Sequence, residues 1–158
     1  MLPSCGVCDV GREYKQGIYK LKNPEKYCGK KNPRYLSSYE LKTFKFLDNH
    51  SSVIKWGAET IVVPYYNPVK KRKARYMVDI YVKYQDKDGN IIEELLEIKP
   101  KAQAKRPVKR GRKKISTFQQ EELTYATNIA KWQAAEKFAN ERGWNFRVIT
   151  EDDIYKYN

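Results

Sequence analysis

Three residues in two neighbouring segments have the types and the spacing of a metal site that cleaves phosphodiesters. Asp79 lies in the segment YMVDIYVKY (76–84), and Glu97 and Lys99 lie in the segment IIEELLEIK (91–99). Side chains two residues apart on a strand lie on one face, roughly 7 Å apart, so we expect Glu97 and Lys99 to point the same way. Carboxylate oxygens are ligands for Mg²⁺, and a lysine beside them can orient water or stabilise charge in the transition state.

The backbone carbonyl of Ile98 could supply a further ligand, because Ile98 directly follows Glu97. An acid followed by acid-x-lysine is by itself a weak pattern in a chain with 32% charged residues, and a lysine at a strand end is common on any sheet edge. The interpretation as a metal site is better supported here, because Asp88-Gly89-Asn90 supplies the turn of a hairpin between the two segments. We therefore predict a Mg²⁺ site at this hairpin, in which Mn²⁺ would substitute.

The elements that position these residues follow the order α-β-β-β-α-β and end in a short helical turn. A capping box formed by Ser37 and Glu40 predicts a helix over 38–49. β-Branched and aromatic residues predict strands over 60–66, 76–84, 92–99 and 144–150. A long helix is predicted from Ser116 to Gly143, with a break at Thr127-Asn128 left open.

This order of elements predicts an α/β (α+β) domain with a central mixed sheet flanked by helices. Residues 1–35 are rich in Gly and Pro and are predicted to be an irregular N-terminal arm, so that the domain proper spans 36–158. Within 76–84, strand alternation predicts that Val78, Ile80 and Val82 share one face. Met77, Asp79 and Tyr81 would share the other.

The positive charge of the chain is concentrated in two segments. The formal net charge is +13, and residues 70–75 contain five Lys or Arg while residues 101–114 contain eight, with no acid in either. Both are predicted to be loops that contact the phosphates of DNA, although solvated loops would show the same composition. The predicted DNA contacts are Lys70, Lys71, Arg72, Lys73, Arg75, Lys101, Lys105, Arg106, Lys109, Arg110, Arg112, Lys113 and Lys114.

Several other classes of protein are disfavoured. The chain has no run of 18 apolar residues and no signal-peptide pattern, so a membrane protein is not indicated and a cytosolic location is expected. No phosphate-binding or dinucleotide glycine motif occurs, which argues against a nucleotide cofactor. Cys5-x-x-Cys8 with Cys28, and His50 further on, could form a zinc site, but reduced unpaired cysteines are the default interpretation and zinc is considered unlikely.

Beyond these patterns, the chain resembles the head-completion nucleases of T-even-type tailed phages. Those nucleases resemble in turn the TnsA-type transposon endonucleases, within the PD-(D/E)xK nuclease superfamily. The resemblance covers roughly residues 16–154 and is carried by WGAET, VPYY, EIKPK and KWQAA, which occur in the family's order. It implies a restriction-endonuclease-like fold.

The resemblance also implies roles for individual residues. Asp79 matches the metal-binding acid, Glu97 the second acid and Lys99 the catalytic lysine, whereas Val78 stands where the superfamily name has proline. Glu40 matches a glutamate that joins the site from the first helix in TnsA-like enzymes, although its capping position explains an acid there equally well. Glu59 is a further acid near the site, and we consider it a weaker candidate for a catalytic role than Glu40.

The implied function is that of a Mg²⁺-dependent DNA endonuclease in phage head completion. It would process DNA ends of the filled head before the tail attaches, in the host cytoplasm or on the virion, with head, portal or neck proteins as partners. Two alternatives remain open. One is a non-catalytic head or portal protein that binds DNA with a retained nuclease fold, and the other is a strand-cutting subunit of a transposition or restriction system.

Overall fold

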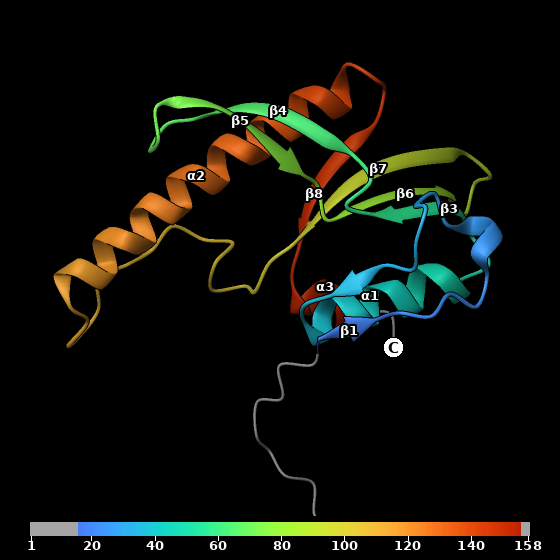
Figure 1. The fold of residues 1–158 in the computed structure, drawn as a ribbon, viewed down its shortest axis with the longest axis horizontal. Helices are drawn as coiled ribbons and strands as arrows, with labels where there is room; N and C mark the ends of the chain where they lie inside the picture. The colour runs from blue at the N-terminus through green and yellow to red at the C-terminus, as the bar shows by residue number, and fades with distance from the viewer. Residues whose placement is uncertain (1–15, 156–158) are drawn as a thin grey trace, which may run out of the picture.

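A four-stranded mixed sheet forms the centre of the computed structural model, which describes residues 16–155 (Figure 1). The strands are ordered β3-β6-β7-β8, with bounds Val53–Ala58, Ile80–Gln85, Ile91–Ile98 and Asn145–Ile149. β6 runs antiparallel to both of its neighbours, β3 and β7, and β8 runs parallel to β7. The predicted α/β (α+β) class and the mixed sheet are therefore confirmed.

Helices cover both faces of this sheet and create two cores. On one face, α1 (Ser38–Asn49) and α3 (Glu151–Tyr155) flank a core that includes Ile80 and Leu96. On the other face, α2 (Ile115–Asn140) packs over Leu95 and the hairpin formed by β4 (Val62–Asn67) and β5 (Arg72–Met77). Leu95 and Leu96 belong to different cores because successive strand residues point to opposite faces.

The first basic segment is part of this hairpin. Residues 70 and 71 lie in its turn, whereas the prediction of a loop is wrong for 72–75. Residues 72–75 lie in β5, where Lys73 and Arg75 are exposed and Ala74 is half-buried. The turn is closed by Asn67, whose Oδ1 accepts hydrogen bonds from the backbone N–H of Val69 and Lys70 at 3.0 and 2.9 Å. Asparagine favours such turns, because its side chain bonds the backbone a few residues further on.

The predicted strand over 76–84 is interrupted at Val78-Asp79. The Val78 N–H donates to the Ile61 carbonyl, and the Asp79 carbonyl accepts from the Glu59 N–H. Val78 therefore packs in the core beneath α2, whereas Ile80 and Val82 pack in the core beneath α1, and the predicted common face is wrong. At this point the chain leaves the hairpin and joins the sheet, so the strand alternation restarts.

Residues 16–35 also differ from the predicted irregular arm, because they pack on the domain. They contain β1 (Gly17–Ile18), a 3₁₀ turn η1 (Pro24–Lys26) and β2 (Arg34–Tyr35), which pairs with β1. The fully buried Asp48 of α1 accepts hydrogen bonds from the Tyr19 hydroxyl and from the backbone N–H groups of Lys22 and Asn23. These bonds attach the segment to α1.

The remaining helical predictions are confirmed in outline. Ser37 caps α1, and α2 ends just before Gly143, which has a φ of 72°. The break considered at Thr127-Asn128 does not occur, and α2 is continuous with Asn128 buried. No helix among residues 16–155 is long and apolar enough to cross a membrane.

Candidate active site

The candidate site lies where the pairing of β6 with β7 ends. The two strands pair in antiparallel register as far as Ile80 opposite Leu96, which confirms the predicted hairpin. Beyond that pair, the Asp79 side chain takes the place of a strand partner. Its Oδ2 accepts a hydrogen bond of 2.8 Å from the Ile98 N–H. Asp79 is thereby held beside the end of the strand that carries Glu97.

The backbone of β7 directs one carbonyl towards the same place. In an antiparallel pair, the N–H and C=O of one residue point to the same neighbouring strand. The Ile98 N–H points to Asp79, so the Ile98 carbonyl points to that side as well. The Lys99 N–H points the opposite way and donates to the Ile149 carbonyl of β8 at 3.0 Å. Ile98 therefore presents a carbonyl at the end of the ladder, and its role as a metal ligand stays a prediction.

Glu97 is nearly inaccessible to solvent, with 3% of its surface exposed, and is held from two sides. The Lys99 Nζ lies 3.0 Å from its Oε1, and the Tyr76 hydroxyl of β5 donates to its Oε2. Burial acts to lower the pKa of Lys99, but the charge of Glu97 and the hydrogen bond to it outweigh burial and raise that pKa. Lys99 is therefore a cation fixed beside a buried carboxylate.

Burial and the neighbouring Glu97 carboxylate raise the pKa of Asp79 to about 7, against the opposing effects of the Ile98 hydrogen bond and Lys99. The buried Glu97 and the half-buried Asp79 form a carboxylate pair that a divalent cation would stabilise, so the donor set fits Mg²⁺. No three acidic, His or Cys side chains among residues 16–155 converge closely enough to hold a metal. The site thus offers two carboxylates and a backbone carbonyl rather than a three-acid cluster.

Glu40 lies at the edge of this site and is engaged at the start of its own helix. Its Oε2 accepts from the Leu36 N–H at 2.7 Å, while its own N–H donates to the Ser37 Oγ at 3.2 Å. The charge of Glu40 nevertheless helps to raise the pKa of Asp79, although burial and Glu97 raise that pKa more. The capping interpretation of Glu40 is confirmed, and its role in catalysis stays a prediction.

Sequence reasoning missed Tyr76, which supports Glu97, and Lys131, which packs on Tyr76. Tyr76 is buried and donates its hydroxyl to Glu97, and burial together with the Glu97 charge raises the pKa of that hydroxyl, so it stays a donor. The Lys131 Nζ of α2 lies 5.5 Å from the centroid of the Tyr76 ring. The motif KWQAA, which contains Lys131, was the only available signal. Glu59, by contrast, is exposed and contacts the site through its backbone.

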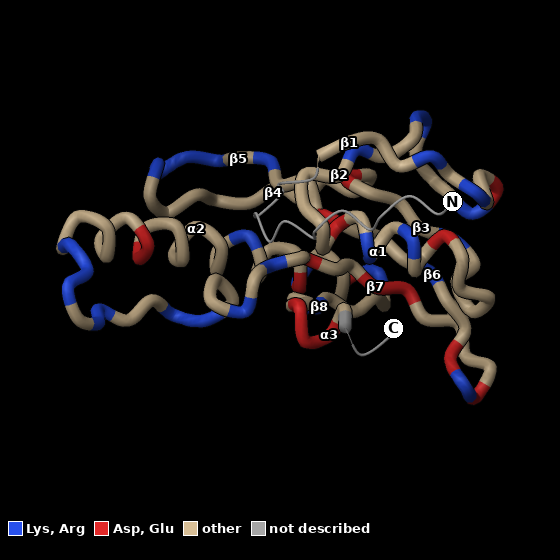
Figure 2. Tube along the Cα trace, turned by 90° about the horizontal axis from the view of Figure 1, so that it is seen from below, with Lys and Arg blue, Asp and Glu red and all other residues tan. Residues whose placement is uncertain are grey.

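The two basic segments run along either side of α2 (Figure 2). The residues predicted to contact DNA are exposed except for Lys113, which is half-buried. Three of them are paired with acids. Lys113 lies 2.7 Å from Glu121, Lys101 lies 2.6 Å from Asp152, and Arg106 lies 3.9 Å from Glu122.

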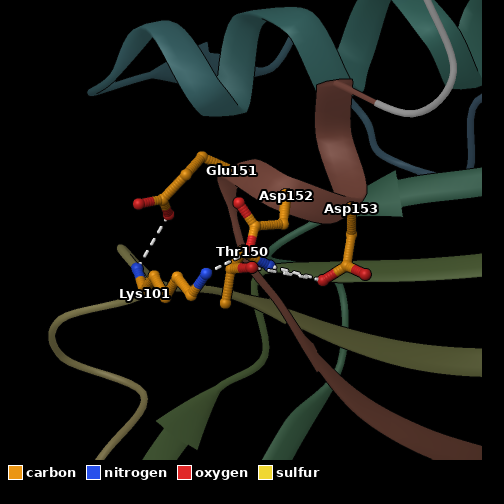
Figure 3. A network of polar contacts seen from close by, with 5 residues as sticks. All are labelled: Lys101, Thr150, Glu151, Asp152 and Asp153. Atoms are coloured by element: carbon orange, nitrogen blue, oxygen red, sulfur yellow. Dashed lines mark hydrogen bonds and ion pairs between the residues drawn. The ribbon is translucent and has the colours of Figure 1, made fainter.

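Lys101 is further tied to the start of α3 (Figure 3). Its backbone N–H donates to Glu151 Oε2 at 2.7 Å, and Asp153 caps the same helix by accepting from the Thr150 N–H at 2.9 Å. These contacts fix the beginning of the second basic segment two residues after Lys99. A phosphate could reach the Lys101 ammonium only in competition with Asp152.

The candidate zinc ligands are not assembled by the described residues. Cys5 and Cys8 lie outside the described range. Cys28 is exposed and forms no disulfide, and the His50 Nδ1 accepts a hydrogen bond from the Ser52 N–H at 3.2 Å.

Comparisons with known proteins show the family of the chain. The family model described as "TnsA-like endonuclease N terminal" matches residues 50–151, a range that includes Asp79, Glu97, Lys99 and both basic segments but not Glu40. The protein named "Head completion nuclease" of Enterobacteria phage T4 is 39% identical over 142 residues, which cover 87% of this chain and 92% of that protein. The chain belongs to the TnsA-like endonuclease family.

Proposed function

We propose that the chain is a Mg²⁺-dependent DNA endonuclease that processes DNA ends while a phage head is completed. The observation that carries this proposal is the meeting of Asp79, Glu97 and Lys99 at the end of the β6–β7 ladder. The similarity to the T4 protein, over nearly the full length of both chains, supports the role in head completion. Such a role would place the chain in the host cytoplasm during assembly, with head, portal or neck proteins as partners.

Each residue of the site has a distinct task in this proposal. Asp79, Glu97 and the Ile98 carbonyl would hold the metal ion. When bound, Mg²⁺ would supply a Lewis acid for the phosphate and a water of lowered pKa. The Tyr76 hydroxyl fixes the orientation of Glu97. The Lys99 ammonium would then stabilise negative charge on the phosphate, because such fixed charges are strongest in a buried site.

The two basic segments would hold the DNA backbone on either side of α2. Lysine and arginine contacts to phosphates carry little sequence information, so binding should depend steeply on salt and weakly on sequence. Lys73 and Arg75 are the best placed of these residues, because they are exposed on a regular strand whose neighbours are packed.

The test is cleavage of supercoiled and linear duplex DNA in Mg²⁺ by the wild-type protein, by Asp79→Ala and by Asp88→Ala. Asp88 is a matched control because it is an exposed acid in the turn between β6 and β7, so its loss changes the charge equally. Loss of a metal ligand should remove several kcal/mol of transition-state stabilisation, which corresponds to about a hundredfold or more in rate. We expect Asp88→Ala to retain activity and Mn²⁺ to replace Mg²⁺.

Two results would contradict the proposal. Equal cleavage by the wild type and Asp79→Ala would exclude this site. Binding of Mg²⁺ by the wild-type protein without cleavage of duplex, branched or single-stranded DNA would indicate a non-catalytic DNA-binding protein instead. Nicking of supercoiled circles would establish endonuclease rather than exonuclease activity, because a circle has no end.

A further inference from the structure

A groove of about 730 Å³ lies between the two basic segments, along the exposed side of α2. Tyr66 and Pro68 of the β4–β5 hairpin form one side, and Arg106 of the second basic segment contributes to the other. The floor is a face of α2 that includes Tyr125 and Ile129. The groove thus combines apolar and aromatic walls with one cation, Arg106, in its lining, and the two basic segments run on either side of the helix that forms its floor (Figure 2).

We propose that this groove binds one or two unpaired nucleotides of a DNA strand. The substrate of the enzyme would then carry a single-stranded extension or branch next to the duplex that is cut. This inference rests on the proposed function in one respect, namely that the ligand of the chain is DNA. It adds a site and a substrate class that the active-site residues do not specify.

The aromatic side chains fit a base. Tyr66 is 57% exposed although tyrosine is a large, partly apolar residue, and its neighbour across the hairpin is Lys73. Unpaired bases stack on such side chains without sequence preference, while neighbouring cations hold the phosphates. Tyr125 provides a second ring in the same groove, braced by an edge contact with Trp132 at 6.5 Å between centroids.

Size and charge restrict the occupant. The volume lies within the range of roughly 300–1,000 Å³ that is typical of small-ligand pockets, so it admits a nucleotide or two but not a duplex. Arg106 lines the groove, and the segments 70–75 and 101–114 beside it contain five and eight basic residues with no acid in either, which favours a polyanion over an apolar peptide. Glu122 also lines the groove but lies 3.9 Å from Arg106, which offsets its charge.

The groove leads towards the active site along α2. Its lining includes Ala130 and Gln133, which flank Lys131 in the sequence. Lys131 lies over the ring of Tyr76, whose hydroxyl donates to Glu97. A strand held in the groove would therefore extend towards the carboxylates, which places the adjacent duplex near the site of cleavage.

The inference is tested by fluorescence with a short duplex that carries a three-nucleotide extension and 2-aminopurine at its first unpaired position. A blunt duplex serves as the reference, and EDTA prevents cleavage. We expect the wild type to quench the probe and to bind the extended duplex more tightly than the blunt one. Tyr66→Ala should weaken binding of the extended duplex about five- to a hundredfold and abolish quenching, and Tyr66→Trp should preserve both. Met77→Ala, an exposed position on the same hairpin, should change neither.

Three results would overturn the inference. These are no quenching by the wild type, no preference for the extended duplex, or an equal loss of affinity for both duplexes in Tyr66→Ala. Circular dichroism and thermal unfolding of each variant separate these results from misfolding. Because binding is measured without metal, the outcome is independent of catalysis. A protein that binds as expected but never cuts would contradict the proposed function alone, and a protein that cuts without this selectivity would contradict the inference alone.

Discussion

Replacing Asp79 by Asn should stabilise the metal-free protein at alkaline pH, although it should abolish cleavage. Burial and the nearby Glu97 raise the pKa of Asp79 from 3.8 to about 7. Well below pH 4 the carboxyl is protonated in both the folded and the unfolded state. Between pH 4 and 7 the unfolded state ionises first, so the stability of the wild type falls as pH rises.

The size of this effect follows from the shift in pKa. Each unit of difference between the two states corresponds to about 1.4 kcal/mol, so a shift of about three units would destabilise the folded wild type by up to about 4 kcal/mol above pH 7. Asp79 is not fully buried, and solvent screens part of its interaction with Glu97. We therefore expect Asp79→Asn to be more stable than the wild type by about 2 kcal/mol at pH 8 and by close to zero at pH 4.

Urea unfolding in EDTA at several pH values between 4 and 8 measures this difference. Asp88→Asn is the control, because Asp88 is exposed in the hairpin turn and its loss should give no gain that grows with pH. Added Mg²⁺ should stabilise the wild type by about 2.7 kcal/mol at a hundred times its dissociation constant, and Asp79→Asn much less. A gain that is absent or independent of pH would refute the reasoning that Asp79 is buried beside a second carboxylate.

Two further variants test the surroundings of the site. Tyr76→Phe removes the hydroxyl that orients Glu97, so it should weaken Mg²⁺ binding about 10- to 100-fold. It also leaves an oxygen of the buried Glu97 without its donor, so it should cost about 1–3 kcal/mol of stability. Calorimetric metal titration and urea unfolding measure the two effects, and unchanged affinity would exclude this role. Asp48→Ala leaves the Tyr19 hydroxyl and two backbone N–H groups without their acceptor and should destabilise the fold by about 3 kcal/mol or more. A loss below about 1 kcal/mol in urea unfolding would show that residues 16–35 contribute little to the fold.

The parts of the fold that could be predicted from the sequence are governed by local contacts. Ser37 caps α1 through a bond to a residue three positions away. The turn between β6 and β7 forms because Asp86 Oδ1 accepts from the N–H groups of Asp88 and Asn90 at 2.9 and 2.8 Å, and Gly89 adopts a φ of 85°. Such bonds depend only on neighbouring residue types, so composition and spacing indicate them.

The parts that could not be predicted depend on distant partners. Exposed basic residues occur on both faces of β5, because Arg72 shares a face with Ala74 and Tyr76 while Lys73 and Arg75 share the other. The segment therefore resembles a charged loop in the sequence. The segment forms a strand because Tyr76, together with Val63 of the facing strand, packs beneath α2, which lies far along the chain. The contact of Lys131 with Tyr76 likewise joins residues 55 positions apart, and no local pattern indicates it.

The interruption at Val78-Asp79 shapes the candidate site, because it places the Asp79 side chain beside the strand that carries Glu97 and Lys99. If residues 76–85 formed one continuous strand, the register of Ile80 with Leu96 would place the backbone of Val78 opposite Ile98. The Ile98 N–H and carbonyl would then be consumed by the ladder. Because Val78 instead bonds to Ile61, Asp79 accepts from the Ile98 N–H with its side chain and the Ile98 carbonyl remains at an open end. The same break that ends the pairing of β6 with β7 thus leaves both a carboxylate and a carbonyl beside Glu97, which would allow the proposed metal site to form from two acids instead of three.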